Sequence, residues 1–499
     1  MTVAPLMIPA LVLVPLLSGV GALMIRRDRH RRILLATAAC LHLLLTLGAG
    51  RAAPVLGDWL ALDALGRLFL TITSTLFLAA ALYGLGYLAR ETGSGPGHHR
   101  DIEEGALFTN APEAVFTACL LFFLATMTLV CASNHLGILW VAVEATTLAS
   151  APLIYFHRHH RSLEAAWKYL LICSIGIALA LLGTFLLAVA TKSAVYGEIP
   201  LRLDLLLRSG ASFQPLWLKA AFIFLLVGYG TKMGLAPLHT WLPDAHSESP
   251  SLVSALLSGA LLNCAFLGIL RVQQVLIAAG LAPFGQQLLV GFGLLSIGIG
   301  AAFILRQPDY KRMLAYSSVE HMGILALGVG VGGAAVFGAL FHAVNHSLVK
   351  GMLFLVAGNI LAAAQTKTVA DIRGLARSLP VSGALWLAGF FAITGTPPFG
   401  TFLSEITILK AAIDGGHVGI ALAFLAGLAV VFIAMCAVVL GMVQGRPDPL
   451  PEATTGREAW SAVLPPAALG SLALLLGLTM PPFLARLLAD AARLLGGAL

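Results

Sequence analysis

Apolar runs long enough to cross a bilayer recur along almost the whole chain, and they restrict the fold more than any other feature. A helix of about twenty apolar residues spans the hydrocarbon core. Of 499 residues, 59% are hydrophobic and 11% are charged, against about 25% charged in soluble domains. The sequence therefore predicts an all-α polytopic membrane protein, one membrane domain over residues 1–499. About fourteen spans are expected, near 4–24, 32–50, 64–88, 113–132, 135–155, 166–190, 217–236, 249–270, 284–305, 313–332, 337–363, 381–411, 417–443 and 459–480.

Basic residues in the short connections predict the orientation. Such residues stay on the cytoplasmic side of a membrane, and here they concentrate in alternate loops, beginning with RRDRHRR after the first span. Both termini are therefore expected on the non-cytoplasmic side of the cell membrane. Topology explains the net charge of +7, so a nucleic-acid partner is not indicated. No basic segment precedes the first apolar run, which argues against a cleaved signal peptide.

The cysteines and glycines show no cofactor motif. Six cysteines are scattered inside apolar spans without a C-x-x-C pair or a Cys/His cluster. There is no G-x-G-x-x-G after a strand, no P-loop and no haem-type motif. We expect no cofactor and no metal in this chain, and no redox chemistry of its own.

The segment 226–250, LVGYGTKMGLAPLHTWLPDAHSESP, breaks the membrane pattern. Lys232 lies inside an apolar span, where a charged group is costly and usually functional. Pro237 and Pro243 interrupt the helix that follows, and non-helical backbone in the membrane is tolerated where it lines a buried or watery cavity. His239 lies in this interruption. The segment is therefore a candidate site for ion movement.

Three further polar residues lie in the first half of the chain. Glu144 is about ten residues into its span, near the bilayer midplane, so it must be paired, neutralised or hydrated, and a structural ion pair is the alternative to a functional role. Lys168 is shallow enough to reach the surface, so it is either a topology anchor or a modulator of Glu144. Asn263 is the strongly polar residue of its span. An amide does not carry a proton at ordinary pH, so a relay passing Asn263 requires water.

The second half carries a column of titratable residues. His342, His346 and Lys350 are spaced four apart, which places them on one helix face over about 12 Å. Glu320 and His321 lie about two turns into the preceding span; a helix-end salt bridge is the simpler explanation for Glu320. A metal site at His342 and His346 is the rival interpretation, which we do not favour because no nearby carboxylate or cysteine completes a ligand set.

A second broken helix follows. Gly395, Pro397 and Pro398 interrupt a span, and Glu405 comes directly after them. Two Gly/Pro-broken helices with ionisable residues are typical of transporters built from inverted repeats. We expect three spans in 1–110, a first repeat in 111–271, a second in 280–445, and the last span and tail in 456–499. Lys410 either pairs with Glu405 or marks the helix end.

Several phrases carry a family resemblance. GTKMGLAPLHTWLPDAHSESP, DYKRMLAYSSVEHMG, HSLVKGMLFLVAGN and GTPPFGTFLSE resemble the antiporter-like proton-translocating subunits shared by complex I, membrane-bound [NiFe] hydrogenases and multisubunit cation/proton antiporters. Among them the chain looks most like the hydrogenase-4 component F branch, with the M-type subunit of NADH:quinone oxidoreductase close to it. The resemblance implies fourteen helices, two inverted five-helix repeats, and broken seventh and twelfth helices.

The resemblance also implies roles for the matching residues. Glu144 and Lys232 would be the coupled pair of the first half-channel, and Glu405 the terminal site. The chain departs from the pattern at Asn263, where M-type relatives commonly have a lysine, and this puts a direct lysine-to-lysine relay in doubt. The predicted proton-translocation residues are Glu144, Lys168, Lys232, His239, Asn263, Glu320, His321, His342, His346, Lys350, Glu405 and Lys410.

The function implied is proton translocation in a redox-driven membrane complex. The expected partners are other membrane subunits, both antiporter-like and quinone or haem-free anchor subunits, a peripheral redox module with Fe–S clusters, and the lipid bilayer. Two alternatives share this fold. One is a cation/proton antiporter or inorganic-carbon-uptake subunit, and the other is a membrane anchor that does not pump.

Overall fold

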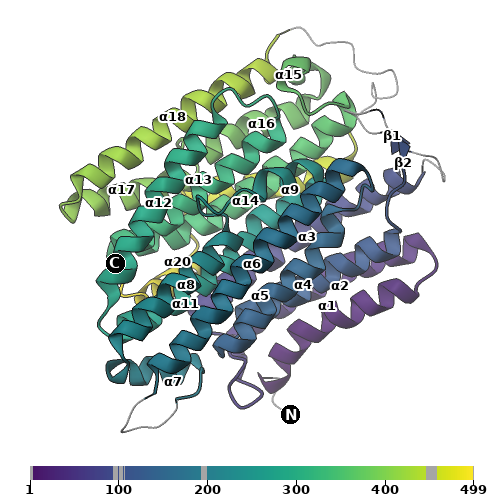
Figure 1. Cartoon of the computed structure of the whole chain (residues 1–499). Coiled ribbons are helices and arrows are strands. Elements are labelled where there is room, and N and C mark those ends of the chain that lie inside the picture. Colours follow the sequence, from purple (N-terminus) through teal and green to yellow (C-terminus); the bar gives the residue numbers. More distant parts are fainter. Residues whose placement is uncertain are drawn as a thin grey trace.

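The computed structural model describes residues 4–93, 99–100, 105, 107–192, 199–445 and 458–497. Its helices lie side by side along one diagonal direction, with α15, β1 and β2 at the upper right and α7 at the lower left (Figure 1). The α-helices are α1 (Met7–Met24), α2 (Asp28–Gly48), α3 (Ala64–Gly93), α4 (Glu113–Ala132), α5 (Leu136–Ile154), α6 (His160–Ala190), α7 (Leu203–Ser209), α8 (Pro215–Met233), α9 (Leu242–Glu248), α10 (Ser251–Leu256), α11 (Leu262–Ala278), α12 (Ala282–Ile304), α13 (Tyr310–Val331), α14 (Ala334–Ala364), α15 (Leu375–Ser378), α16 (Pro380–Ile393), α17 (Gly400–Asp414), α18 (Val418–Val443), α19 (Trp460–Leu478) and α20 (Pro482–Arg493). Strands β1 (His99–Arg100) and β2 (Leu107–Phe108) pair antiparallel.

The described residues contain 13 helices long and apolar enough to cross a membrane. The predicted span 381–411 is not among them, because it is divided into α16 and α17. The 13 helices and this divided segment together agree with the predicted number of about fourteen. The prediction of an all-α polytopic membrane protein is confirmed, whereas the inverted relation of the repeats and their boundaries stay predictions.

Both predicted helix interruptions are present, and local chemistry explains them. Gly234 ends α8 in the left-handed conformation, with φ of 83°, which glycine adopts without steric cost. Pro243 stands in the first turn of α9, where its missing N–H is harmless. Gly395 also has a positive φ, 63°, after the end of α16. The two breaks place short helices, α9 and α17, where continuous spans would otherwise run.

A further irregularity was not predicted. Residues Leu257–Leu261 form a π-helical turn, η4, between α10 and α11. Such turns occur frequently at functional sites. Asn263 lies two residues after the turn, so the residue that departs from the family pattern lies close to a local distortion of the helix.

The polar spans occupy the centre of the bundle. The apolar window of Ser251–Ala278 is 100% buried inside the chain and that of α13 is 89% buried, against 28% for α1 and 33% for α18. Buried helices need not be apolar all round, because neighbouring helices rather than lipid cover them. The ionisable residues of α13 and α14 therefore face protein.

The connections gather at two ends, as the charge pattern predicted. At one end Arg32 pairs with Glu113 at 2.7 Å, Asn110 bridges to His157, and Asp309 bridges to Thr368. We call this the basic end. At the opposite end Arg202 bridges to His135 and lies 3.3 Å from Asp58. The grouping of the loops is confirmed, and the assignment of the basic end to the cytoplasm stays a prediction. The expected solvated loop at 90–104 falls mostly outside the described residues.

Candidate functional site

Lys232 and Glu144 are joined through a hydroxyl group. The Lys232 side chain is fully buried, and its Nζ donates to Thr147 Oγ1 at 2.8 Å and to Tyr169 OH at 2.6 Å. Thr147 in turn donates to Glu144 Oε2 at 3.2 Å. A hydroxyl can accept one hydrogen bond while donating another, so Thr147 connects the ammonium to the carboxylate. The two predicted partners therefore communicate through one intervening side chain rather than by direct contact.

Lys168 lies elsewhere. Its Nζ is 3.0 Å from Asp244 and 2.6 Å from Glu164, and its side chain is 45% exposed. Glu144 instead accepts from Ser174 Oγ at 3.1 Å. Of the two alternatives for Lys168, the structure shows a surface ion pair and no contact with Glu144.

Histidines from two helices form a hydrogen-bonded chain in the second half. His321 Nδ1 of α13 lies 2.8 Å from His342 Nε2 of α14, and His342 Nδ1 lies 2.9 Å from Ser404 Oγ of α17. The ring of His346 is 5.1 Å from that of His321. All three histidines are buried. A cluster of titratable rings therefore lies where α13, α14 and α17 meet.

Two buried carboxylates border the histidines. Glu320 Oε2 is 3.4 Å from His321 Nε2. Among the described residues Glu320 has no ion pair with a lysine or an arginine, so the alternative of a helix-end salt bridge is not the one found. Glu405 offers a ligand atom within 4.8 Å of those of His321 and His342. Our expectation that no carboxylate lies near His342 is therefore wrong, because the fold brings α17 against α14.

Lys410 does not pair with Glu405. Its side chain is 72% exposed and forms an ion pair with Asp414 one turn further along α17. Lys410 thus marks the end of the helix, which was one of the two alternatives for it.

Lys350 connects the histidine column to the beginning of α13. Its Nζ donates to Leu314 O at 2.7 Å and to Ser317 Oγ. One turn before Leu314, Lys311 donates to the backbone oxygens of Ser247 and Ser249 at 2.9 and 2.8 Å. Polar groups therefore follow α13 from the basic end toward His321, over about 15 Å at the helical rise.

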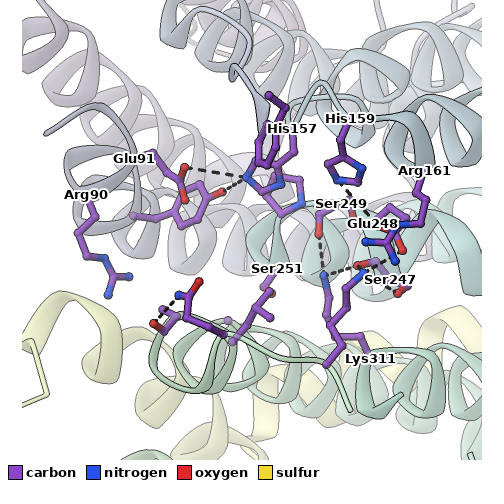
Figure 2. A pocket seen from close by; sticks show the side chains of 18 of the residues that line it. Arg90, Glu91, His157, His159, Arg161, Ser247, Glu248, Ser249, Ser251 and Lys311 are labelled. Atoms are coloured by element: carbon purple, nitrogen blue, oxygen red, sulfur yellow. Dashed lines mark hydrogen bonds and ion pairs between the residues drawn. The ribbon is translucent and has the colours of Figure 1, made fainter. Parts of the chain in front are cut away.

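A cavity of about 460 Å³ opens at the basic end (Figure 2). Figure 2 shows Lys311 and Glu248 on one side of it and Arg90 with Glu91 on the other. This cavity could not be predicted from the sequence, because its lining comes from loops and helix ends far apart in the chain. The charged and histidine residues that line it are Arg90, Glu91, His157, His159, Arg161, Glu248, Lys311 and Lys367.

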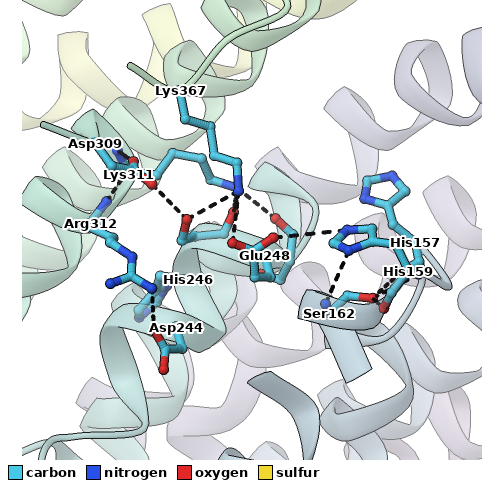
Figure 3. Close-up of polar contacts among 12 residues, drawn as sticks. His157, His159, Ser162, Asp244, His246, Glu248, Asp309, Lys311, Arg312 and Lys367 are labelled. Atoms are coloured by element: carbon cyan, nitrogen blue, oxygen red, sulfur yellow. Dashed lines mark hydrogen bonds and ion pairs between the residues drawn. The ribbon is translucent and has the colours of Figure 1, made fainter. Parts of the chain in front are cut away.

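Glu248 is the central carboxylate of this lining. Lys367 Nζ donates to Glu248 Oε1 at 2.8 Å, and His159 Nε2 lies 3.9 Å from Glu248 Oε2 on the other side (Figure 3). Burial alone would raise the pKa of the Glu248 carboxyl, but the charges of Lys367, Arg161 and Lys311 outweigh it and hold this pKa below its ordinary value. Glu248 is therefore a charged acceptor at the cavity wall.

His246 directly precedes Ser247 of the cavity lining and contacts α14. It is fully buried, and neither ring nitrogen has a hydrogen-bond partner among the described residues. Its ring stacks on Phe354, one turn beyond Lys350 on α14, with centroids 4.9 Å apart. The phrase DAHSES contained this residue, but its spacing gave no sign that it would face α14.

Asn263 and His239 occupy intermediate positions. Asn263 Nδ2 donates to Gly259 O at 2.9 Å and to Ser347 Oγ at 2.7 Å. Ser347 is the neighbour of His346 on α14, so Asn263 connects the eighth span to the histidine column. His239, between α8 and α9, has its ring 6.2 Å from that of Tyr316, and its Nδ1 has no partner among the described residues.

The sequence matches a known protein family and several of its members. Residues 133–431 match the family described as NADH:quinone oxidoreductase/Mrp antiporter, TM. The chain belongs to this family. It is 39% identical to a hydrogenase-4 component F homolog of Methylacidiphilum infernorum, over 71% of this chain and 73% of that protein. It is 31% identical to NADH-quinone oxidoreductase subunit N of Desulforudis audaxviator, over 73% of this chain and 68% of that protein.

Solved structures show the same fold. A chain of the Mrp complex from Dietzia sp. superposes with a TM-score of 0.85 at 21% identity, covering 99% of this chain and 98% of that one. A chain of respiratory complex I from Thermus thermophilus with bound NADH superposes with a TM-score of 0.78 at 26% identity, covering 98% of this chain and 100% of that one. Both chains come from complexes, the Mrp complex and respiratory complex I.

Proposed function

We propose that the chain is a proton-translocating subunit of a redox-driven membrane complex of the hydrogenase-4 or NADH:quinone oxidoreductase type. The family and the sequence relatives support this class of function. The buried polar residues supply a physical route. The chain itself contributes ion movement, and the redox chemistry belongs to an associated module.

The route begins at the basic end. Protons enter the cavity, whose wall carries the charged Glu248 carboxylate, and pass His246 to reach Lys350. From Lys350 the path continues along α14 to His346, across to His321 and His342, and on to Glu405. Along this path His321 and His342 are hydrogen-bonded, Glu405 has a ligand atom within 4.8 Å of those of both, and His246 contacts α14 through Phe354.

The observation that carries the proposal is a set of buried polar atoms without hydrogen-bond partners along this route. A buried polar atom without a partner costs about 1–3 kcal/mol, and such atoms are ordinarily satisfied by protein or by water. Water molecules that join these groups would provide the proton path. Among the described residues, the atoms are both ring nitrogens of His246 and of His346, Glu320 Oε2 and Glu405 Oε1.

Glu144 and Lys232 supply a means of coupling. Because only Thr147 separates them, a change in the charge of Glu144 alters the electrostatic potential at Lys232. Glu144 is only half-buried on α5, so a neighbouring subunit can reach it. A charge change in that neighbour would then be transmitted to Lys232.

The finer assignments complete the proposal. The complex lies in the cell membrane, with both termini of the chain on the non-cytoplasmic side, and it includes antiporter-like and anchor subunits and a peripheral Fe–S module. The alternating basic loops support this orientation.

Substitution of Lys350 tests the route. We expect Lys350→Ala in the assembled complex to lower the rate of proton translocation about tenfold or more, because a group that exchanges protons contributes at least that much. The measurement is the acidification of proteoliposomes, with electron transfer recorded in parallel. Lys410→Ala, which removes an exposed lysine of the adjacent helix, should leave the rate unchanged.

Equal rates for the Lys350→Ala complex and the parent would contradict the route. Sodium-dependent flux in the parent complex would favour the cation/proton antiporter instead. Intact electron transfer with no proton movement in the parent complex would favour the membrane anchor.

A further inference from the structure

We propose that His321, His342 and Glu405 form a binding site for a divalent transition-metal cation such as Zn²⁺. Each residue offers one ligand atom, and the three atoms lie within 4.8 Å of one another. Two imidazoles and one carboxylate are a ligand set that Zn²⁺ uses with a fourth, open position. In a tetrahedral zinc site the ligand atoms are roughly 3.4 Å apart, so small side-chain rotations bring the three atoms to bonding distance.

The second coordination shell is already in place. A histidine that binds a metal usually has its other ring nitrogen held by a hydrogen bond, which fixes the orientation of the ring. His342 has this arrangement, because its Nδ1 lies 2.9 Å from Ser404 Oγ while its Nε2 faces His321 Nδ1 at 2.8 Å. A metal would take the place of the proton between the two histidines, and that proton would move to His321 Nε2, which lies 3.4 Å from Glu320 Oε2.

Unused donor atoms surround the same point. Glu405 Oε1 has no hydrogen-bond partner among the described residues, and neither ring nitrogen of His346 has one. Both side chains are more than nine-tenths buried, and the His346 ring is 5.1 Å from that of His321. His346, or a water molecule bound to it, can supply the fourth ligand.

The broken helix provides the approach for the ion. Gly395, in the connection between α16 and α17, lies against the Glu405 carboxylate so closely that a Cβ there would be 1.8 Å from Oε2. Pro397 and Pro398 of the same connection are exposed on the surface of the chain. The connection between α16 and α17 thus borders the carboxylate on one side and reaches the surface of the chain on the other.

A bound ion would hold together α13, α14 and α17. It would also occupy the nitrogen atoms of His321 and His342 that exchange protons in the proposed route. Zn²⁺ should therefore inhibit proton translocation reversibly, and this consequence, unlike metal binding itself, depends on the proposed function.

Cobalt is the probe for the site, since four-coordinate Co²⁺ has intense visible absorption that six-coordinate Co²⁺ lacks. We expect the full chain in detergent to bind one Co²⁺ with the four-coordinate spectrum, and Zn²⁺ to displace it. Glu405→Gln and His342→Gln should each weaken binding by about 100-fold, the upper end of what outer-shell changes cost. His417→Gln, which alters an exposed histidine at the start of α18, should leave it unchanged.

Three results would overturn the metal site. They are a six-coordinate spectrum in the parent chain, an unchanged affinity in Glu405→Gln, and a loss of binding in His417→Gln. The parent spectrum needs no variant, so a variant that fails to fold does not remove the test. If Zn²⁺ binds but does not slow proton translocation, and a chelator has no effect on the rate, the metal site stands and the proposed proton route fails.

Discussion

Thr147 is the residue on which the proposed electrostatic coupling depends. It accepts a hydrogen bond from Lys232 and donates one to Glu144. Sequence reasoning selected the two charged residues and passed over the hydroxyl, because a threonine in a membrane helix ordinarily bonds to its own backbone. Its importance follows only from its position between α5 and α8.

Removal of that hydroxyl should weaken the coupling. We expect Thr147→Val to lower the translocation rate about tenfold, because a hydrogen bond to a charged group contributes about 1.5–3 kcal/mol. Thr147→Ser keeps the hydroxyl and should retain most of the rate. The measurement is proton translocation in proteoliposomes at constant electron transfer. A rate in Thr147→Ser as low as that in Thr147→Val would show that packing rather than the hydroxyl matters.

At the scale of elements, the two interruptions decide where polar groups can gather. Gly395 combines a φ of 63° with direct contact on the Glu405 carboxylate. Gly416, just beyond the other end of α17, has a φ of 78° but no atom near the position of a Cβ. Both glycines have a positive φ, but of the two only Gly395 is in close contact with another side chain, that of Glu405.

This difference gives a matched pair of substitutions. Gly395→Ala and Gly416→Ala should both lose about 1–2 kcal/mol of stability, because alanine is strained at positive φ. Gly395→Ala should in addition displace Glu405 and abolish translocation. Thermal unfolding of the purified chain and proton translocation of the assembled complex measure the two effects. If both variants translocate at the parent rate, the position of Glu405 against the break has no functional role.

At the scale of the whole molecule, the two halves of the chain meet at the cavity of the basic end. Lys311 and Lys367, from the second half, hold Ser247, Glu248 and Ser249 of the first half (Figure 3). The side chains of Glu248 and Lys367 are each 8% exposed. A change of charge at this cavity therefore acts on residues of both halves.

The ion pair of Glu248 and Lys367 predicts how the stability of the folded chain depends on pH. The pKa of Glu248 is lowered in the folded chain, so the stabilisation is present above the unfolded pKa of about 4.3 and is lost as the pH falls through the folded pKa. Lys367→Met removes the partner and raises the folded pKa of Glu248 toward its unfolded value, so the acid-induced loss of stability should be smaller and should be complete at a higher pH. Thermal unfolding of the purified chain between about pH 4 and about pH 7 measures this shift.

The control for the pair is the double variant Lys367→Met with Glu248→Gln. Removing one partner of a buried pair costs about 3–5 kcal/mol, mainly because the other charge stays buried. The double variant should therefore be more stable than Lys367→Met alone. A double variant that is equally or less stable would mean that the contact contributes through packing and not through charge.

The sequence by itself determined the membrane class, the number of spans and the two broken helices. In hydrocarbon every backbone group must be satisfied within its own helix, so apolar length and the positions of glycine and proline are read directly along the chain. A charged side chain inside a span is likewise costly, so each ionisable residue there, including Lys232, His342 and Glu405, was a candidate for proton translocation. These predictions depend on residues close together in sequence.

Only the tertiary structure decided which candidates meet. Glu405 comes within reach of His342 because α17 packs closely on α14, where Gly338 faces the backbone of Ser404 and has no room for a Cβ. Lys168 and Lys410, for each of which the sequence left two alternatives open, face outward into ion pairs of their own. The cavity around Glu248 is made of loops that meet only after folding. Contacts between helices depend on side-chain packing across them, which the pattern along a single helix does not contain.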